Sequence, residues 1–272
     1  MPTTKSILLG ADAPRVLSVP MIAAVLANRR KLPARNTPLR WIREQTKSGA
    51  LRPVTRGLYI NQLARPLPTA ADAAGFVRGG AIVSLQTVLG EAGVTNSYSD
   101  IVTCVLPHSK DHRPSVRPVK AERIEFRFHA MPARFLDEHA GEIEDRIDLD
   151  FKYPRATPEK ALLDWIYLGA SARTKIAGPP FDIDAVRLKK ARLQRLAKAM
   201  SLESQLKTYW ESKRKYDEDP ELKRTTLWMR GSSAPPIVSP LLTISSIGCA
   251  VNLIMSIPNS SSVVKSPDWL IL

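Results

Sequence analysis

The sequence predicts an α+β fold, in which a small N-terminal helical region closed by a hairpin precedes a mixed α/β domain with a small sheet and a helical end. Three observations predict it. Residues 18–60 contain two helix-like segments followed by two apolar runs around a glycine turn. Residues 82–130 contain short runs of β-branched and aromatic residues, and residues 157–214 are patterned as amphipathic helices. A chain of 272 residues is long enough for two modest domains.

Charge and cysteine content indicate which partners, metal sites and cellular location to expect for this protein. The net charge of +14 and the isoelectric point of about 10.0 favour polyanionic partners, which are DNA, RNA or an anionic membrane surface. Cys104 and Cys249 lie far apart without the spacing of zinc ligands, so neither a metal site nor a disulfide framework is expected. The apolar stretch near the N-terminus is too short for a signal peptide. We expect a cytoplasmic protein without cofactor or metal.

The N-terminal elements follow in order from local signals. Residues 5–9 suggest a short helix, and Ser18 precedes a helix over residues 20–28 with an apolar stripe. After a turn over residues 32–36, a helix over residues 38–48 is expected, because Thr37 can cap it, Pro38 fits its first position and Gly49 ends it. Residues 51–60 predict a hairpin whose Gly57 supplies a positive φ.

A helix followed at once by a basic hairpin is typical of a winged helix-turn-helix. Between residues 29 and 56 there are nine basic residues against one acidic residue, Glu44. Leu39 and Ile42 form a face that can be buried, while cations spaced i, i+3 and i+7 form another. A basic run is often only a solvated face, but the capped helix and the Arg-tipped hairpin together favour DNA binding. The predicted DNA-binding residues are Arg35, Arg40, Arg43, Lys47, Arg52 and Arg56.

Composition divides the chain into four regions. We expect a winged-helix DNA-binding domain over residues 1–62, a linker over 63–78, an α/β domain over 79–215 and a disordered tail over 216–272. The tail carries no charged residue between positions 231 and 264. Its apolar stretch over residues 241–257 is interrupted by polar residues and shorter than the roughly 20 residues of a membrane span, so no membrane anchor is expected.

The α/β domain is predicted from short patterns. A strand at residues 82–83 leads into a helix that Ser84 can cap and Gly93 ends. Pro107 is expected to end a strand over residues 101–106. Alternating polarity predicts half-buried strands over residues 123–130 and 143–153. Three helices follow, over residues 158–168 with Thr157 as cap, over 182–200 with a cationic face, and over 201–214.

Catalytic chemistry has one candidate. Asp148-x-Asp150-x-Lys152 on a strand could place carboxylates on Mg²⁺ and a lysine near a phosphate, as in a DNA-targeted nuclease. The solvent-exposed face of a strand normally carries polar residues, so these three need no catalytic role. We therefore expect a binding protein and not an enzyme. Cys104 is expected to be packed, and His108 with His112 lacks a third metal ligand.

Three motifs in order resemble a known family. They are Gly57-Leu58-Tyr59-Ile60, Ile82-Val83-Ser84-Leu85-x-x-Val88-Leu89-x-x-x-Gly93, and Ala156-Thr157-Pro158-Glu159-Lys160-Ala161-Leu162-Leu163-Asp164. With this order and spacing, residues 18–215 resemble the AbiEi family of bacterial antitoxins from type IV toxin–antitoxin, or abortive-infection, systems.

The resemblance implies a function. It implies a transcriptional repressor whose winged helix binds inverted repeats in its own promoter, with the DNA-reading segment on Arg40, Arg43 and Lys47 and with Arg52 and Arg56 at the wing. It also implies a C-terminal domain that counteracts a nucleotidyltransferase-like toxin, with or without direct contact. The nuclease and, more weakly, a membrane-tethered regulator are the alternatives.

Overall fold

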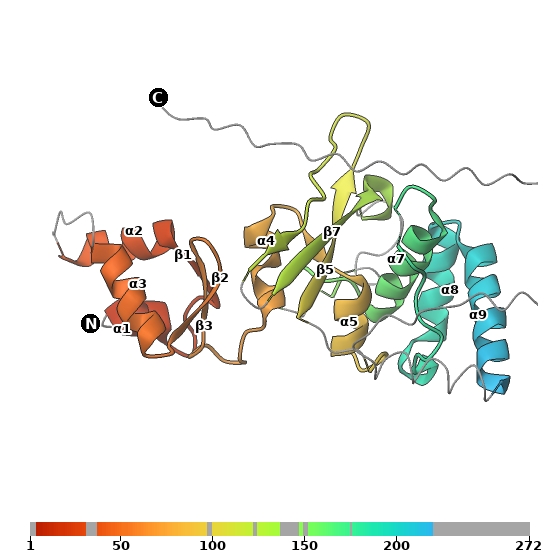
Figure 1. The fold of residues 1–272 in the computed structure, drawn as a ribbon, viewed down its shortest axis with the longest axis horizontal. Coiled ribbons are helices and arrows are strands. Elements are labelled where there is room, and N and C mark those ends of the chain that lie inside the picture. Colours follow the sequence, from red (N-terminus) through yellow and green to blue (C-terminus); the bar gives the residue numbers. More distant parts are fainter. Residues whose placement is uncertain are drawn as a thin grey trace, which may run out of the picture. The chain divides into compact units, whose positions relative to one another are not determined.

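The protein is a mixed α+β structure. The computed structural model describes residues 4–30, 37–96, 100–121, 124–136, 147–148, 152–174 and 176–219, all within one compact unit, Met1–Arg224. Over these ranges the chain forms eight α-helices and two small β-sheets (Figure 1). The expected α+β class is therefore confirmed.

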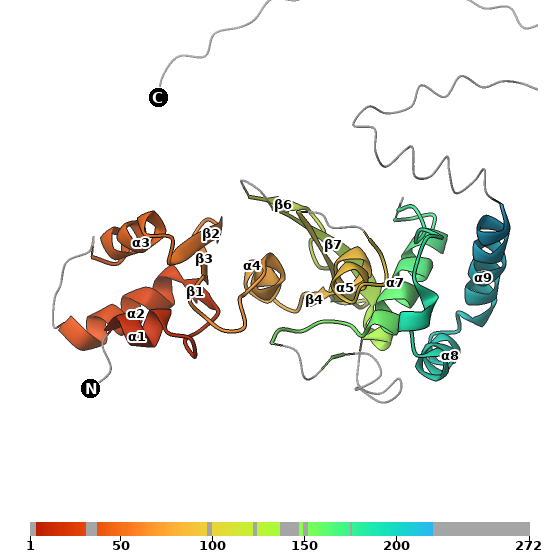
Figure 2. The ribbon, with the colours of Figure 1, turned by 90° about the horizontal axis from the view of Figure 1, so that it is seen from below.

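The N-terminal region contains three helices and three strands. These elements are α1 (Thr4–Leu9), β1 (Val16–Ser18), α2 (Val19–Arg30), α3 (Thr37–Lys47), β2 (Leu51–Thr55) and β3 (Leu58–Asn61). The strands form an antiparallel sheet in the order β1-β3-β2. In Figures 1 and 2 the helices lie together beside this sheet. Their shared core consists of Leu8, Leu9, Leu17, Ile22, Leu26, Ile42, Ala50 and Leu51.

The predicted helices and hairpin of this region are confirmed, and β1 is an addition. Thr55 pairs with Leu58 across a two-residue turn whose Gly57 has φ +82°. The carbonyl of Gly57 accepts a hydrogen bond of 3.1 Å from the Val19 amide, which ties the turn to the start of α2. Pro53 is tolerated because β2 is an edge strand of the sheet.

The segment expected as a linker is largely folded. It contains a 3₁₀ turn, Ala70–Ala73, and the short helix α4 (Ala74–Val77). Ala71, Ala73 and Ala74 are buried in the larger of the two apolar cores. The Asp72 carboxylate accepts a 2.8 Å hydrogen bond from the Thr69 amide and forms an ion pair with Arg15. Small alanines therefore pack into the core within the segment that composition predicted to be a linker.

The second sheet contains four strands in the order β4-β5-β7-β6. They are β4 (Ile82–Val83), β5 (Ile101–His108), β6 (Val119–Lys120) and β7 (Glu125–Pro132). β5 and β7 run parallel, from the pair Ile101 with Glu125 to the pair His108 with Pro132, and the other neighbours are antiparallel. Phe126 and Phe128 are buried on the apolar face of β7, as its alternating sequence predicted.

Pro107 does not end β5, contrary to the sequence prediction. The Thr103 amide points away from β7, because it donates to the Thr87 hydroxyl at 2.8 Å. Backbone groups of every second residue in a strand point to the same side. Pro107 lies four positions after Thr103, so its nitrogen, which carries no proton, also faces away from β7. β4 pairs only with Cys104 and Val105, and no bond to β4 is lost at Pro107.

Helices cover the sheet and form the C-terminal end of the described fold. α5 (Leu85–Glu91) packs on α7 (Pro158–Ala170), which also contacts α8 (Lys190–Ala199) and α9 (Glu203–Glu218). A 3₁₀ turn, Ala133–Phe135, follows β7. Figure 1 shows α7, α8 and α9 side by side. Ala161, Leu162 and Leu163 on α7 are fully buried, which confirms the expected central position of this helix.

The predicted helix over residues 182–200 is broken. A 3₁₀ turn, Ala185–Arg187, precedes α8, because the Asp184 side chain accepts from the Val186 amide and the Lys189 amide donates to the Glu159 carboxylate at 2.7 Å. Val186, expected on the apolar stripe, is 93% exposed. α9 runs to Glu218, past the predicted domain end at residue 215.

Two further predictions need correction. Ser84 occupies the N-cap position of α5, but its hydroxyl donates to Asp164 at 2.7 Å instead of capping the helix. The strand expected over residues 143–153 falls mostly outside the described residues. Within it, Ile147 forms an isolated bridge with Ala156, while Lys152 and Tyr153 lie in a bend.

Thr157 caps α7 as predicted, and this cap can be tested. Its hydroxyl accepts from the Lys160 amide at 3.4 Å, with Pro158 at the first helical position. We expect Thr157→Ala to lower the free energy of unfolding by about 1 kcal/mol, since the buried end of the helix loses a hydrogen-bond acceptor. Urea denaturation measures the change, and Thr157→Ser should retain most of the stability. Equal losses in both variants would mean that the hydroxyl is not the stabilising group.

His129 predicts a pH dependence of stability. Burial, and secondarily the charge of Arg127, lower the pKa of His129 below its ordinary value of 6.5. The unfolded chain therefore binds a proton at a higher pH than the folded chain, so stability falls as the pH is lowered through 6.5. We expect the unfolding free energy to drop less between pH 7.5 and 5.5 in His129→Gln than in the wild type. Parallel curves would contradict this.

Candidate nucleic-acid interface

The surface of α3 carries the candidate interface. Leu39, Arg43, Thr46 and Lys47 lie at i, i+4, i+7 and i+8 and so share one helical face. With Ile42 from α3 and with Pro53 and Tyr59 from the hairpin, they line a shallow groove of about 510 Å³, called here the α3 groove. A helix and a hairpin thus form one concave surface with two cations at its edge.

Burial of the neighbouring side of α3 fixes the direction in which this face points. Ile42 is buried in the core shared with Ile22 and Leu26 of α2, and Trp41 packs at its margin. Leu39, which was expected to be buried with Ile42, is 52% exposed. Leu39 precedes Ile42 by three residues, so its direction differs from that of Ile42 by about 60°, and it lies on the groove side.

The cations of α3 divide into two groups. Arg43 and Lys47 are exposed, line the α3 groove and form no ion pair with any residue in the described ranges. Arg40 is exposed too, with 81% of its side chain accessible, but its guanidinium is 3.0 Å from the Glu44 carboxylate. Because exposed pairs of this kind stabilise a helix by only about 0.3–0.5 kcal/mol, Arg40 can exchange Glu44 for another anion.

The hairpin cations lie in different places. Neighbouring residues of a strand point to opposite faces, and Pro53, not Arg52, lines the α3 groove. Arg52 instead lines a separate pocket of about 350 Å³ with Thr69, Thr87 and other residues. Arg56 is exposed at the turn of the hairpin. Arg35 lies outside the described residues.

The structure therefore brings together only part of the predicted set. Arg43 and Lys47 share the α3 groove, Arg40 flanks it on the same helix, and Arg52 faces elsewhere. Sequence reasoning missed Leu39, Thr46 and Tyr59 as parts of this surface. The spacing of Leu39, Arg43 and Thr46 in the sequence could have shown that they share one face of the helix. The contribution of Tyr59 could not be predicted, because it depends on how the hairpin packs against α3.

The nuclease candidate does not form a described cluster. Asp148 is 3.5 Å from Arg155 and Lys152 lies exposed in a bend, while Asp150 is outside the described residues. Within the part of the chain that the structure describes, no group of three or more His, Cys, Asp or Glu residues could hold a metal ion. Cys104 is fully buried, and burial raises the pKa of its thiol to about 12, as expected for a packed cysteine.

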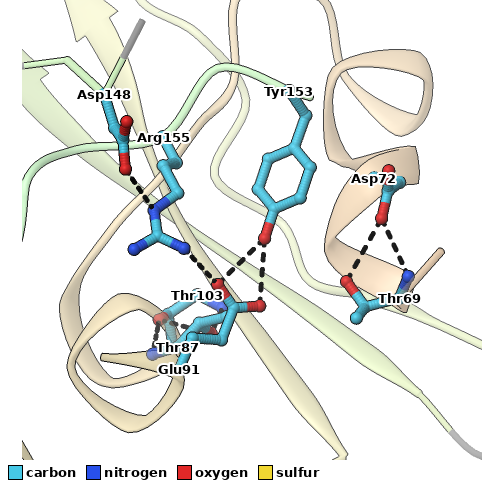
Figure 3. A network of polar contacts seen from close by, with 8 residues as sticks. All are labelled: Thr69, Asp72, Thr87, Glu91, Thr103, Asp148, Tyr153 and Arg155. Carbon is cyan, nitrogen blue, oxygen red and sulfur yellow. Dashed lines mark hydrogen bonds and ion pairs between the residues drawn. The ribbon is translucent and has the colours of Figure 1, made fainter. Parts of the chain in front are cut away.

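Asp148 belongs instead to a partly buried polar network, shown in Figure 3. Arg155 bridges Asp148 and Glu91, with a 3.0 Å contact to the Glu91 carboxylate, and the Tyr153 hydroxyl donates to the same carboxylate at 2.9 Å. Burial raises the pKa of Glu91, although its contacts with Tyr153 and Arg155 oppose the shift. The network joins α5 to the segment before α7, so we interpret it as a contact that stabilises the fold.

No helix described between residues 4 and 219 combines the length and apolar character required to cross a membrane. The apolar stretch at residues 241–257 lies outside the described residues.

The comparisons with known proteins establish no relationship. No protein-family model matches the chain, and no curated protein matches it. One solved structure with a partial likeness is "Crystal structure of RV2827C protein from Mycobacterium tuberculosis", at 14% sequence identity and a TM-score of 0.43, over 87% of this chain and 85% of that one. A likeness this distant supports no statement about family or function.

Proposed function

We propose that this protein is a DNA-binding transcriptional repressor whose N-terminal region is a winged helix-turn-helix. In this proposal α3 is the recognition helix, α2 supports it and the β2–β3 hairpin is the wing. The element order α1-β1-α2-α3-β2-β3, with the sheet order β1-β3-β2, supports this assignment. It is the order in which a helix pair followed by a hairpin would present one helix beside a wing.

The observation that carries the proposal is the position of Arg43 and Lys47 in the α3 groove. Both are exposed and line this groove, and neither has an anionic partner among the described residues. The major groove of B-DNA, about 12 Å wide, admits an α-helix, and cations along such a helix reach phosphates or guanine edges. Arg56 at the hairpin turn would contact the backbone beside it.

The antitoxin part of the proposal rests on the resemblance to the AbiEi family. We propose that the protein binds repeats in its own promoter and counteracts a nucleotidyltransferase-like toxin encoded beside it. Co-expression tests this part independently of DNA binding. The neighbouring reading frame should inhibit growth alone and not with this protein, and growth inhibition that persists in the presence of both would remove the antitoxin assignment.

DNA binding is tested by fluorescence anisotropy with the duplex immediately upstream of the coding sequence. We expect binding to this duplex to be tighter than to a shuffled duplex of the same composition, and Arg43→Gln to weaken it. Lys198→Gln on α8 is the matched control, because it removes one exposed cation far along the chain from α3. Equal affinity for both duplexes would rule out a sequence-specific repressor.

A further inference from the structure

Leu39 is an apolar side chain exposed among cations. It is 52% exposed, lies at the third position of α3 and lines the α3 groove beside Arg43. Exposure of a leucine is ordinary. Leu39, however, lies on the face of α3 that carries Arg43 and Lys47, which have no anionic partner among the described residues, whereas the exposed Val186 lies in a separate 3₁₀ turn. Its position suggests that a partner covers it.

The chemistry of the duplex limits what a leucine can recognise. Its side chain neither donates nor accepts a hydrogen bond, so it cannot distinguish the polar base edges directly. The only apolar group that the four bases present in the major groove is the 5-methyl group of thymine. Recognition helices contact base edges with residues near their N-termini, which is where Leu39 lies in α3.

We propose that Leu39 is a specificity-determining residue that selects thymine through contact with its 5-methyl group. Arg43, one turn further along the same face, binds an adjacent phosphate or base edge and holds Leu39 against the methyl group. Pro53 and Tyr59 line the same groove and add apolar surface beside Leu39. This inference rests on the proposed DNA binding by α3.

The test compares two versions of the upstream duplex, one with thymine and one with deoxyuridine, which lacks only the methyl group. We expect the wild type to bind the deoxyuridine duplex about fourfold more weakly for one buried methyl contact. Leu39→Ala should bind the thymine duplex about as weakly as the wild type binds the deoxyuridine duplex. It should show no preference between the thymine and deoxyuridine duplexes. Leu39→Met should retain the preference because it keeps an apolar side chain of similar size.

Leu63→Ala is the control, since Leu63 is also an exposed leucine but does not line the α3 groove. It should discriminate thymine from deoxyuridine as the wild type does. Equal binding of both duplexes by the wild type would overturn the inference while leaving DNA binding intact, as would a thymine preference that survives in Leu39→Ala. Failure of the wild type to bind either duplex would overturn the proposed function itself, and the inference with it.

Discussion

Replacing Arg43 and Lys47 together by alanine is expected to weaken binding to the upstream duplex by about 2–4 kcal/mol, which is roughly 30- to 1,000-fold. Both side chains line the α3 groove and neither is held by an anion in the described ranges, so both are free to contact DNA. The slope of log K against log salt concentration should fall in magnitude by about 1.8, since each phosphate contact contributes roughly 0.9. Anisotropy titrations between about 50 and 200 mM KCl measure both quantities.

The matched control is Lys190→Ala with Lys198→Ala. These two lysines are exposed on α8, and their removal changes the net charge by the same amount. If DNA binding depends on α3, this control should retain nearly all of its affinity at moderate salt. An equal loss in the two double variants would show that binding follows net charge and not the α3 groove.

Removing the carboxylate of Asp164 is expected to cost about 3–5 kcal/mol of the free energy of unfolding. Asp164 and Lys160 form an ion pair inside α7, with 0% and 1% of their surfaces exposed, and the Ser84 hydroxyl donates to the same carboxylate at 2.7 Å. Asp164→Ala would leave the Lys160 ammonium and the Ser84 hydroxyl buried without this acceptor. Guanidinium denaturation monitored by circular dichroism measures the loss.

Glu44→Ala provides the comparison for an exposed pair of the same i,i+4 spacing. Glu44 and Arg40 are 3.0 Å apart on the surface of α3, so their separation should cost less than about 1 kcal/mol. Similar losses in Asp164→Ala and Glu44→Ala would contradict the role assigned to burial. Loss of the anion near the α3 groove should also leave DNA binding unchanged or slightly tighter.

Elements marked by local chemistry could be predicted from the sequence. Thr157 and Pro158 specify the start of α7, and Gly57 specifies the turn of the hairpin. The alternation around Phe126 predicted which face of β7 is buried. Each of these signals involves residues within a few positions of each other, and the local preference agrees with the packing.

The remaining features depend on contacts between distant residues. β1 has three residues, too few for a periodic pattern, and it exists through pairing with β3. The break before α8 requires the Lys189 amide to reach Glu159, 30 positions earlier. The same is true of the candidate interface, because whether Leu39 faces the core or the α3 groove depends on where α2 and the hairpin pack against α3.

The position of Arg52 illustrates the limit for site prediction. Composition groups it with the other cations between residues 29 and 56, but the pleat of β2 directs it away from Pro53 and the α3 groove. Strand register was not visible in the sequence, because β2 contains a bulge between Pro53 and Thr55. The net basic charge was therefore predictable, whereas the subset of cations that share a surface was not.

Photo-crosslinking from position 46 tests most directly whether α3 enters the duplex. Thr46 lines the α3 groove without carrying charge, so a photoreactive residue there should leave the cations in place. We predict a covalent adduct with the upstream duplex from position 46 and none from position 194 on α8, where Gln194 is an exposed, uncharged residue. Adducts from position 194 and none from position 46, with both proteins bound to the duplex, would contradict the assignment of α3 as the DNA-binding helix.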